Sequence, residues 1–240
     1  MAAPAITALL GAHKAASGAW TPASFSGLIA WYKADVGVTS SGSPALVSQW
    51  DDQSGNGYHL ANSGSGKPTT GADTINGLNV ITFDGSTKTY LDYSGISQAQ
   101  VYAVYVVTYN NRPSAGGSFA LDHVPMWDDG NPQMFTDGDA NWWLSSDQGG
   151  NNWKSTAASG SPEQLVAIFD GASSTIYQNG TQQGTGDAGT SGFTGNFRLG
   201  AYNSLYHAYD GQVGEFVIQA GTPSGTDLTN WNTYCSRWGL

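Results

Sequence analysis

The sequence predicts an all-β domain, a two-sheet antiparallel jelly-roll sandwich with a short C-terminal helix and an N-terminal arm. Three observations predict it. The chain has 33 glycines and only 11% charged residues, which is typical of turn-rich β proteins. Its apolar residues occur in short runs separated by clusters of Gly, Asn, Asp, Ser and Pro. Its 240 residues are a common length for a single β-sandwich.

The N-terminal segment, residues 1–22 (Met1 to Pro22), is rich in alanine and shows no strand alternation. We expect an arm that contacts another subunit of an assembly and is ordered by that contact; a frayed terminus is the alternative. Residues 23–240 are expected to form the sandwich. The opening residues lack a basic region before their apolar stretch, which argues against a signal peptide. No apolar run approaches the length of a membrane span, so we expect no membrane insertion.

Short apolar runs define the expected strands, and the run at 101–109 is nearly continuous. Except for Ala103 its residues are β-branched or aromatic, as expected of a central strand covered on both faces. Asn179-Gly180 lies between two alternating arms and predicts a tight hairpin. The expected strands are residues 28–34, 46–50, 79–83, 101–109, 118–122, 133–136, 141–145, 163–169, 174–178, 197–202 and 212–219.

The C-terminus changes to a helical period. The apolar residues that share one helical face are Leu228, Trp231, Cys235 and Trp238. Ser224 and Asp227 have the spacing of a capping box, which predicts where the helix begins. Because Cys235 lies on the apolar face, we expect a small buried hydrophobic residue rather than a nucleophile.

The charge balance excludes some partners. With 18 acidic and 8 basic residues the formal net charge is -10, so the chain would repel a phosphate backbone, and no nucleic acid is expected. Neutral glycans or cations suit such a surface better. Cys235 is the single cysteine, so no intrachain disulfide can form.

Six segments in order resemble the successive landmarks of laminin G-like modules of the concanavalin A-like lectin and glucanase superfamily, as found in phage virion and bacterial surface proteins. They are LIAWYKAD (28–35), WDDQSGNGYH (50–59), GLNVITFDGS (77–86), LVAIFDGASSTIYQNG (165–180), FRLGAYN (197–203) and DGQVGEFVIQ (210–219) with its following helix. The resemblance implies the fold and a tendency toward carbohydrate binding or virion attachment. It implies no activity, since lectins, glycanases, lyases and structural modules share this fold.

A glycan-active enzyme, either a glycoside hydrolase or a polysaccharide lyase, is the alternative function. Retaining glycosidases place two carboxylates roughly 5 to 5.5 Å apart. Glu163 and Glu215 are the only glutamates, and the residues two and four positions after Glu215 are Val217 and Gln219. Glu215 is therefore expected to anchor a loop or accept backbone hydrogen bonds. We expect no enzymatic activity and no catalytic residues.

FRLGAYN also faintly resembles a strand motif of alginate lyases, in which Tyr202 and His207 would be acid and base. The other lyase motifs have no counterpart in this sequence.

A zinc site is not indicated, because the four histidines lack zinc-like spacing. No cofactor is expected, with calcium as an option because acidic residues occur in Gly- and Asn-rich segments. The calcium candidates are Asp51, Asp52, Asp137 and Asp139.

A glycan site is expected where tryptophans gather among short polar side chains, in the loop-rich stretch 126–155. Sugars stack on aromatic rings and bond to amides and carboxylates. Trp142 and Trp143 are adjacent, so on a strand one faces the core and the other faces outward. A second candidate rim contains Tyr202, Tyr206, His207 and Tyr209. The candidate glycan-binding residues are Trp127, Asp128, Asp129, Trp142, Trp143, Trp153, Tyr202, Tyr206 and His207.

The function we expect is attachment without catalysis. The chain would be a virion protein (capsid decoration, head fibre or tail) or a surface-attached protein, located on the virion or the extracellular surface. Residues 1–22 would bind other subunits, and the sandwich would display the lectin-like face to a cell-surface glycan.

Overall fold

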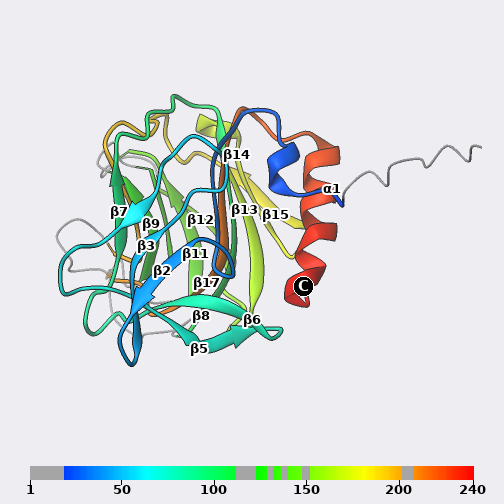
Figure 1. Ribbon diagram of the computed structural model, residues 1–240. Coiled ribbons are helices and arrows are strands. Elements are labelled where there is room, and N and C mark those ends of the chain that lie inside the picture. The colour runs from blue at the N-terminus through cyan, green and yellow to red at the C-terminus, as the bar shows by residue number, and fades with distance from the viewer. Residues whose placement is uncertain (1–18, 112–122, 129–131, 137–139, 148–151, 202–207) are drawn as a thin grey trace, which may run out of the picture.

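The computed structural model describes residues 19–111, 123–128, 132–136, 140–147, 152–201 and 208–240. These residues form seventeen strands, one α-helix and three short 3-10 helices. All strand pairings are antiparallel. The hydrogen-bonded ladder is continuous and folds back on itself into two layers (Figure 1). The predicted antiparallel sandwich is confirmed.

The first layer is centred on two long strands, β17 (Gly211–Ala220) and β8 (Tyr102–Asn110). The other edge of β17 pairs with β1 (Leu28–Lys33) and β6 (Leu78–Phe83). Beyond β8 the layer continues through β13 (Glu163–Phe169), β14 (Ser174–Gln178) and β15 (Thr181–Gly186). The 3-10 helix η2 (Gly171–Ser173) connects β13 to β14.

The second layer is reached from β6 through β5 (Thr69–Ile75), which also pairs with β3 (Ala45–Trp50). β2 (Val38–Ser41) pairs with β3. The layer then runs through β4 (Leu60–Ala61), β7 (Leu91–Ser94), β16 (Asn196–Leu199), β9 (His123–Asp128), β10 (Gln133–Thr136), β11 (Asn141–Ser145) and β12 (Asn152–Ala157).

Most expected strands are present, and the differences are informative. The segment 118–122 lies outside the described residues. The stretch 126–155, which was expected to be rich in loops, contains four strands, β9 to β12. Two of them, β10 and β11, match the expected strands 133–136 and 141–145, whereas β9 and β12 were not expected.

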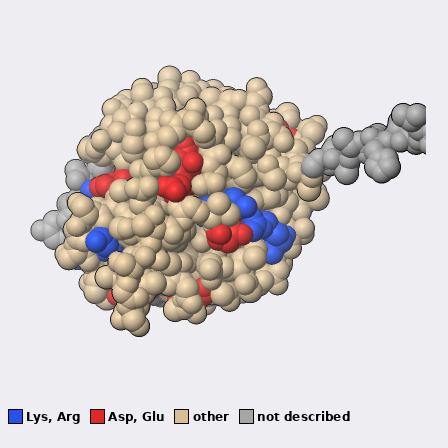
Figure 2. Space-filling model, viewed as in Figure 1, with Lys and Arg blue, Asp and Glu red and all other residues tan. Residues whose placement is uncertain are grey.

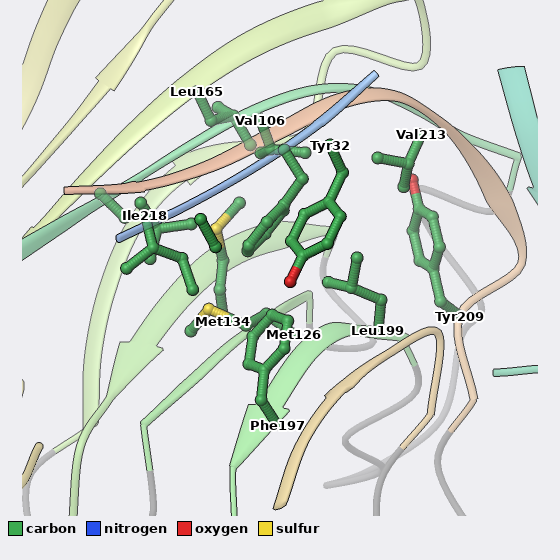
Figure 3. Packing of buried hydrophobic residues seen from close by; sticks show 14 of the residues in the cluster. Tyr32, Val106, Met126, Met134, Leu165, Phe197, Leu199, Tyr209, Val213 and Ile218 are labelled. Atoms are coloured by element: carbon green, nitrogen blue, oxygen red, sulfur yellow. The ribbon is translucent and has the colours of Figure 1, made fainter. Parts of the chain in front are cut away.

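The main core fills the space between the layers (Figure 3). Tyr32 and Ile218 reach into it from the first layer, and Met126, Phe197 and Leu199 from the second. Each of these side chains is 0% exposed. Burial of large apolar side chains at close packing is what holds the two layers together.

A second apolar cluster lies on the other side of the first layer, beneath α1 (Gly225–Tyr234), η3 (Cys235–Trp238) and η1 (Pro22–Ser24). On β8, Tyr102 and Val104 face the main core, whereas Ala103 and Tyr105 face this second cluster. Coverage on both faces explains why this strand is apolar at nearly every position, as predicted.

The local signals in the C-terminal third are confirmed. Asn179 and Gly180 have φ of 48° and 76°, the left-handed geometry of a tight hairpin turn between β14 and β15. Ser224 and Asp227 form the capping box that begins α1. Cys235 is completely buried. No helix among the described residues has the length and apolar character needed to span a membrane.

The described end of the predicted arm, residues 19–22, packs on its own sandwich. Trp20 contacts Phe25 and Tyr234 edge-on, with ring centroids 5.0 and 5.9 Å apart. Pro22 is buried where η1 begins. Residues 1–18 lie outside the described residues, so their contact with another subunit stays a prediction.

Candidate functional site

The outward-facing side of the second layer, which we call the outer face, carries a row of polar positions. Asp92 on β7 lies opposite Arg198 on β16, and Arg198 lies opposite Trp127 on β9. Trp127 is in turn opposite Gln133 on β10. Directly opposite residues of antiparallel strands share one face. Leu199 and Met134 point into the main core, so the side chains of their neighbours Arg198 and Gln133 point away from it.

Arg198 organises one end of the row. Its guanidinium donates to the Asp92 carboxylate at 2.8 Å and lies 4.1 Å from the ring centroid of Tyr90. The Arg198 side chain is 12% exposed and that of Asp92 is 35% exposed. The cation is therefore balanced by the carboxylate and fixed against an aromatic face. This end of the row presents hydrogen-bonding groups in a defined geometry.

A stacked aromatic pair lies at the other end of the outer face. Trp143 on β11 is directly opposite Phe135 on β10, and the two rings are parallel, with centroids 6.0 Å apart and an interplanar angle of 8°. Phe135 is 4% exposed, whereas Trp143 is partly exposed. Because Phe135 is buried, only the partly exposed ring of Trp143 offers an aromatic surface of the kind on which sugar rings stack.

Trp142 belongs to the core, so its place among the candidate binding residues is wrong. It is 0% exposed, which confirms that Trp142 and Trp143 point to opposite faces. Its indole N–H donates to the Glu163 carboxylate at 3.0 Å, and the Gln178 amide donates to the same carboxylate at 2.6 Å. Burial raises the pKa of Glu163 above its ordinary value, although these hydrogen bonds oppose the shift.

Trp153 also has a packing role, and a binding role for it is not supported. It lies on β12 and packs against the main core. A Cβ atom at Gly186 of β15 would lie 2.1 Å from the Trp153 ring, and one at Gly184 would lie 3.2 Å away. The glycines therefore make room for the indole, which fills the side of the sandwich where β12 and β15 meet.

Several predicted site residues lie outside the described part of the structure. Trp127 and Asp128 are placed on β9 by their backbone, and their side chains are among the parts not described. The residues wholly outside it are Asp129, Asp137, Asp139, Tyr202, Tyr206 and His207. Tyr209, predicted on the rim with these tyrosines, is instead 0% exposed, and its hydroxyl donates to the Tyr109 carbonyl at 3.0 Å.

The calcium candidates that are described do not form a metal site. Asp52 is 7% exposed and accepts hydrogen bonds from the backbone N–H groups of Trp31 and Ser54 at 3.0 and 2.8 Å. Its carboxylate thus organises its own loop. Asp51 is 3.4 Å from His59, and no three His, Cys, Asp or Glu side chains gather among the described residues. Calcium at Asp137 and Asp139 stays a prediction.

Glu215 is a structural anchor rather than part of an acid pair. Its carboxylate accepts hydrogen bonds from the indoles of Trp31 and Trp238 at 2.6 and 3.0 Å and from the Tyr234 hydroxyl at 2.8 Å. Arg237 is 3.6 Å away. The partners are side chains, not the backbone groups that we expected. Burial raises the pKa of Glu215, and these contacts oppose the shift.

The two glutamates lie in different environments. Glu163 bonds to Trp142, a residue of the main core, whereas Glu215 bonds to Trp238 in the cluster beneath the helix. Both carboxylates are 0% exposed. Neither carboxylate lies on the outer face.

Tyr90, Asp92 and Arg198 were not predicted as site residues. For Arg198 a signal exists: it lies between Phe197 and Leu199, and strand alternation places it outward. Its partner Asp92 is 106 positions away, and no sequence pattern joins them.

The comparisons with known proteins bear on the fold. No protein-family model and no curated protein matches the sequence. Domain 4 of an extracellular GH43 arabinanase from Geobacillus stearothermophilus, solved with arabinotriose, has a TM-score of 0.58 at 16% identity, over 85% of this chain and 97% of that domain. The likeness shows a β-sandwich fold.

Two larger proteins contain a similar unit. Trypanosoma rangeli sialidase, solved with sialic acid, has a TM-score of 0.60 at 9% identity, over 88% of this chain and 33% of the sialidase. The receptor-binding domain of botulinum neurotoxin type G has a TM-score of 0.58 at 12% identity, over 87% of this chain and 51% of that domain. The chain thus spans a third to a half of these proteins.

Proposed function

We propose that this chain is a non-enzymatic, lectin-like module that binds neutral glycans through its outer face and is displayed on a virion or another surface assembly. The observation that carries the proposal is the outer face itself. It combines the rigid aromatic surface of Trp143 with the hydrogen-bonding platform of Tyr90, Asp92 and Arg198.

Glycan recognition fits the chemistry of these groups. Apolar faces of sugar rings stack on aromatic side chains, and hydroxyl groups bond to carboxylates, amides and guanidinium groups. Strands β16 and β11 are separated by β9 and β10, so Arg198 and Trp143 are three strand spacings apart, about 14 Å. A ligand that contacts both ends is an oligosaccharide rather than a single ring.

The charge of the chain favours a neutral ligand. The formal net charge is -10, and the single described cation of the row is already paired with Asp92. Most of the surface in Figure 2 is uncharged, with the acidic and basic groups confined to a few clusters. An acidic polysaccharide would be repelled at long range.

Two similar structures support binding as the role. The arabinanase domain was solved with arabinotriose, and the neurotoxin domain is a receptor-binding domain. A binding role without catalysis is further supported by the two glutamates, which are buried away from the outer face. Attachment to the assembly through residues 1–22 rests on their alanine-rich composition without strand alternation, and the virion setting rests on the sequence resemblance.

The test compares two adjacent tryptophans on an array of neutral and acidic oligosaccharides that includes arabino-oligosaccharides. Trp143→Ala should weaken binding at least tenfold, equivalent to about 1.4 kcal/mol, when measured at low temperature where the variant is folded. Trp142→Phe is the matched control: it should lower the stability of the fold by about 2–4 kcal/mol and preserve binding at low temperature. Unchanged glycan binding by Trp143→Ala would contradict binding at the outer face.

Attachment is tested separately. Deleting residues 1–18 should abolish incorporation of a normally folded sandwich into its parent particle. Normal incorporation of the truncated chain would contradict the attachment role and leave glycan binding unaffected.

A further inference from the structure

A pocket lies on the opposite side of the sandwich from the outer face. It has a volume of about 160 Å³ and is formed by α1, by β13 and β14, and by the hairpin turn after β14. Figure 1 shows α1 running along this side of the first layer. The pocket is lined by residues that include Gln164 and Tyr177 from the strands and Leu228, Trp231 and Asn232 from the helix.

Polar groups line this pocket. The Gln164 side chain is almost wholly buried, and its amide N–H donates to the Asn232 carbonyl oxygen. Among the described residues, no hydrogen bond reaches the Gln164 carbonyl oxygen or the N–H group of Asn232, which is exposed, so both are open to water or to a ligand. The indole N–H of Trp231 is the one lining group that is buried without a partner among the described residues. These groups give the pocket donors and an acceptor for a polar ligand.

The lining defines the ligand class. None of the lining residues carries a formal charge, so the ligand is neutral. Tyr177 and Trp231 supply aromatic surface, and Gln164 and Asn232 supply one acceptor and one donor. A cavity of about 150 Å³ accommodates one six-membered ring, and this pocket has that size.

The pocket is preformed. Gly180 closes one side of it with φ of +76°, and a Cβ atom there would lie 2.5 Å from the Asn232 carbonyl oxygen. The hairpin turn and the helix are therefore in direct contact at the rim, and the Gln164–Asn232 hydrogen bond joins the same two elements. Little ordering is needed when a ligand binds, which favours affinity.

We infer that this pocket is a second glycan site that binds a single neutral pyranose unit. It goes beyond the outer face because it takes one ring rather than a chain and lies on the other side of the sandwich. A module with two sites can bridge glycan chains, and repeated display on a particle multiplies the effect through avidity.

The test uses the full chain and the monosaccharides glucose, galactose, mannose and N-acetylglucosamine as probes, with binding followed by saturation-transfer NMR and by the indole N–H signal of Trp231. Thr229→Trp fills the pocket from its exposed rim. Thr233→Trp, one turn later and outside the lining, is the matched control. Each threonine hydroxyl donates to the carbonyl four residues earlier, at 2.8 and 3.0 Å, so both variants lose the same local bond.

We expect at least one probe to bind and to shift the Trp231 signal. Thr229→Trp should weaken binding at least tenfold, Thr233→Trp less than twofold, and a Trp143→Ala chain should still bind the monosaccharide. The inference is overturned if no probe binds, if Thr229→Trp binds normally, or if both threonine variants lose binding equally. If oligosaccharides still bind in a Trp143-dependent way, such a failure leaves the outer-face proposal intact.

Discussion

Replacing Glu215 with alanine removes the acceptor that joins β17 to β1 and to the C-terminal helical segment. Three donors reach this carboxylate: the indoles of Trp31 and Trp238 and the hydroxyl of Tyr234. Trp31 is 8% exposed and Trp238 is 1% exposed. After truncation, at least the two indole N–H groups remain buried without a partner.

The expected loss of free energy of unfolding follows from the number of donors left without a partner. Each buried donor left unpaired costs about 1–3 kcal/mol, and removing one partner of a buried charged cluster costs about 3–5 kcal/mol. We therefore expect Glu215→Ala to lower the free energy of unfolding by about 3–5 kcal/mol at neutral pH. Glu215→Gln keeps the volume and one carbonyl acceptor, so its loss should be about 1–3 kcal/mol.

Urea denaturation followed by tryptophan fluorescence and circular dichroism measures both losses. A decrease of less than about 1 kcal/mol for Glu215→Ala would refute the reasoning, because it would mean that the indole donors find other partners. Equal losses for the Ala and Gln variants would also contradict it, since the acceptor is retained only in the second.

We also expect the stability difference between the wild type and Glu215→Gln to depend on pH. Burial raises the folded-state pKa of Glu215, so the folded chain holds this proton more tightly than the unfolded chain does. The resulting stability is fully present below the ordinary glutamate pKa of about 4.3 and is lost as the pH rises through the folded pKa. The stability advantage of the wild type over Glu215→Gln should therefore shrink as the pH rises through this window; a constant advantage would contradict the raised pKa.

Other parts of the fold give further predictions. Gly186→Ala should destabilise the fold by about 1–3 kcal/mol in urea denaturation, since its Cβ collides with Trp153; Gly186→Ala with Trp153→Leu should recover much of the loss. Ser224→Ala should cost about 1 kcal/mol by the same assay, because Asp227 loses its N-cap partner. Burial raises the pKa of the Cys235 thiol, so iodoacetamide should label it only after unfolding; rapid labelling of the native chain would contradict its burial.

The parts of the fold with local signals could be predicted from the sequence. Asn179-Gly180 requires left-handed backbone, which defines the hairpin whatever surrounds it. The run at β8 is apolar on both faces because it is covered on both. The capping box of Ser224 and Asp227 is complete within four residues. Each signal lies within a few positions of the chain.

The site depends on contacts between distant residues, and these could not be predicted. Trp31 and Glu215 are 184 positions apart, and Asp92 and Arg198 are 106 apart. Composition could not separate core from surface tryptophans in residues 126–155, although alternation did separate Trp142 from Trp143. A pairing register decides which polar residues meet, and register arises from the whole sheet.

The central claim is that the chain binds a glycan and leaves it intact. The most direct test incubates the full chain with an oligosaccharide that it retains on the array. Calorimetry then measures how much oligosaccharide is bound. In the same sample, the length of the oligosaccharide and the number of new reducing or unsaturated ends are measured. The account predicts saturable binding with the oligosaccharide recovered at its original length. Cleavage of the bound oligosaccharide, abolished by Glu215→Gln in a chain that still folds, would contradict it.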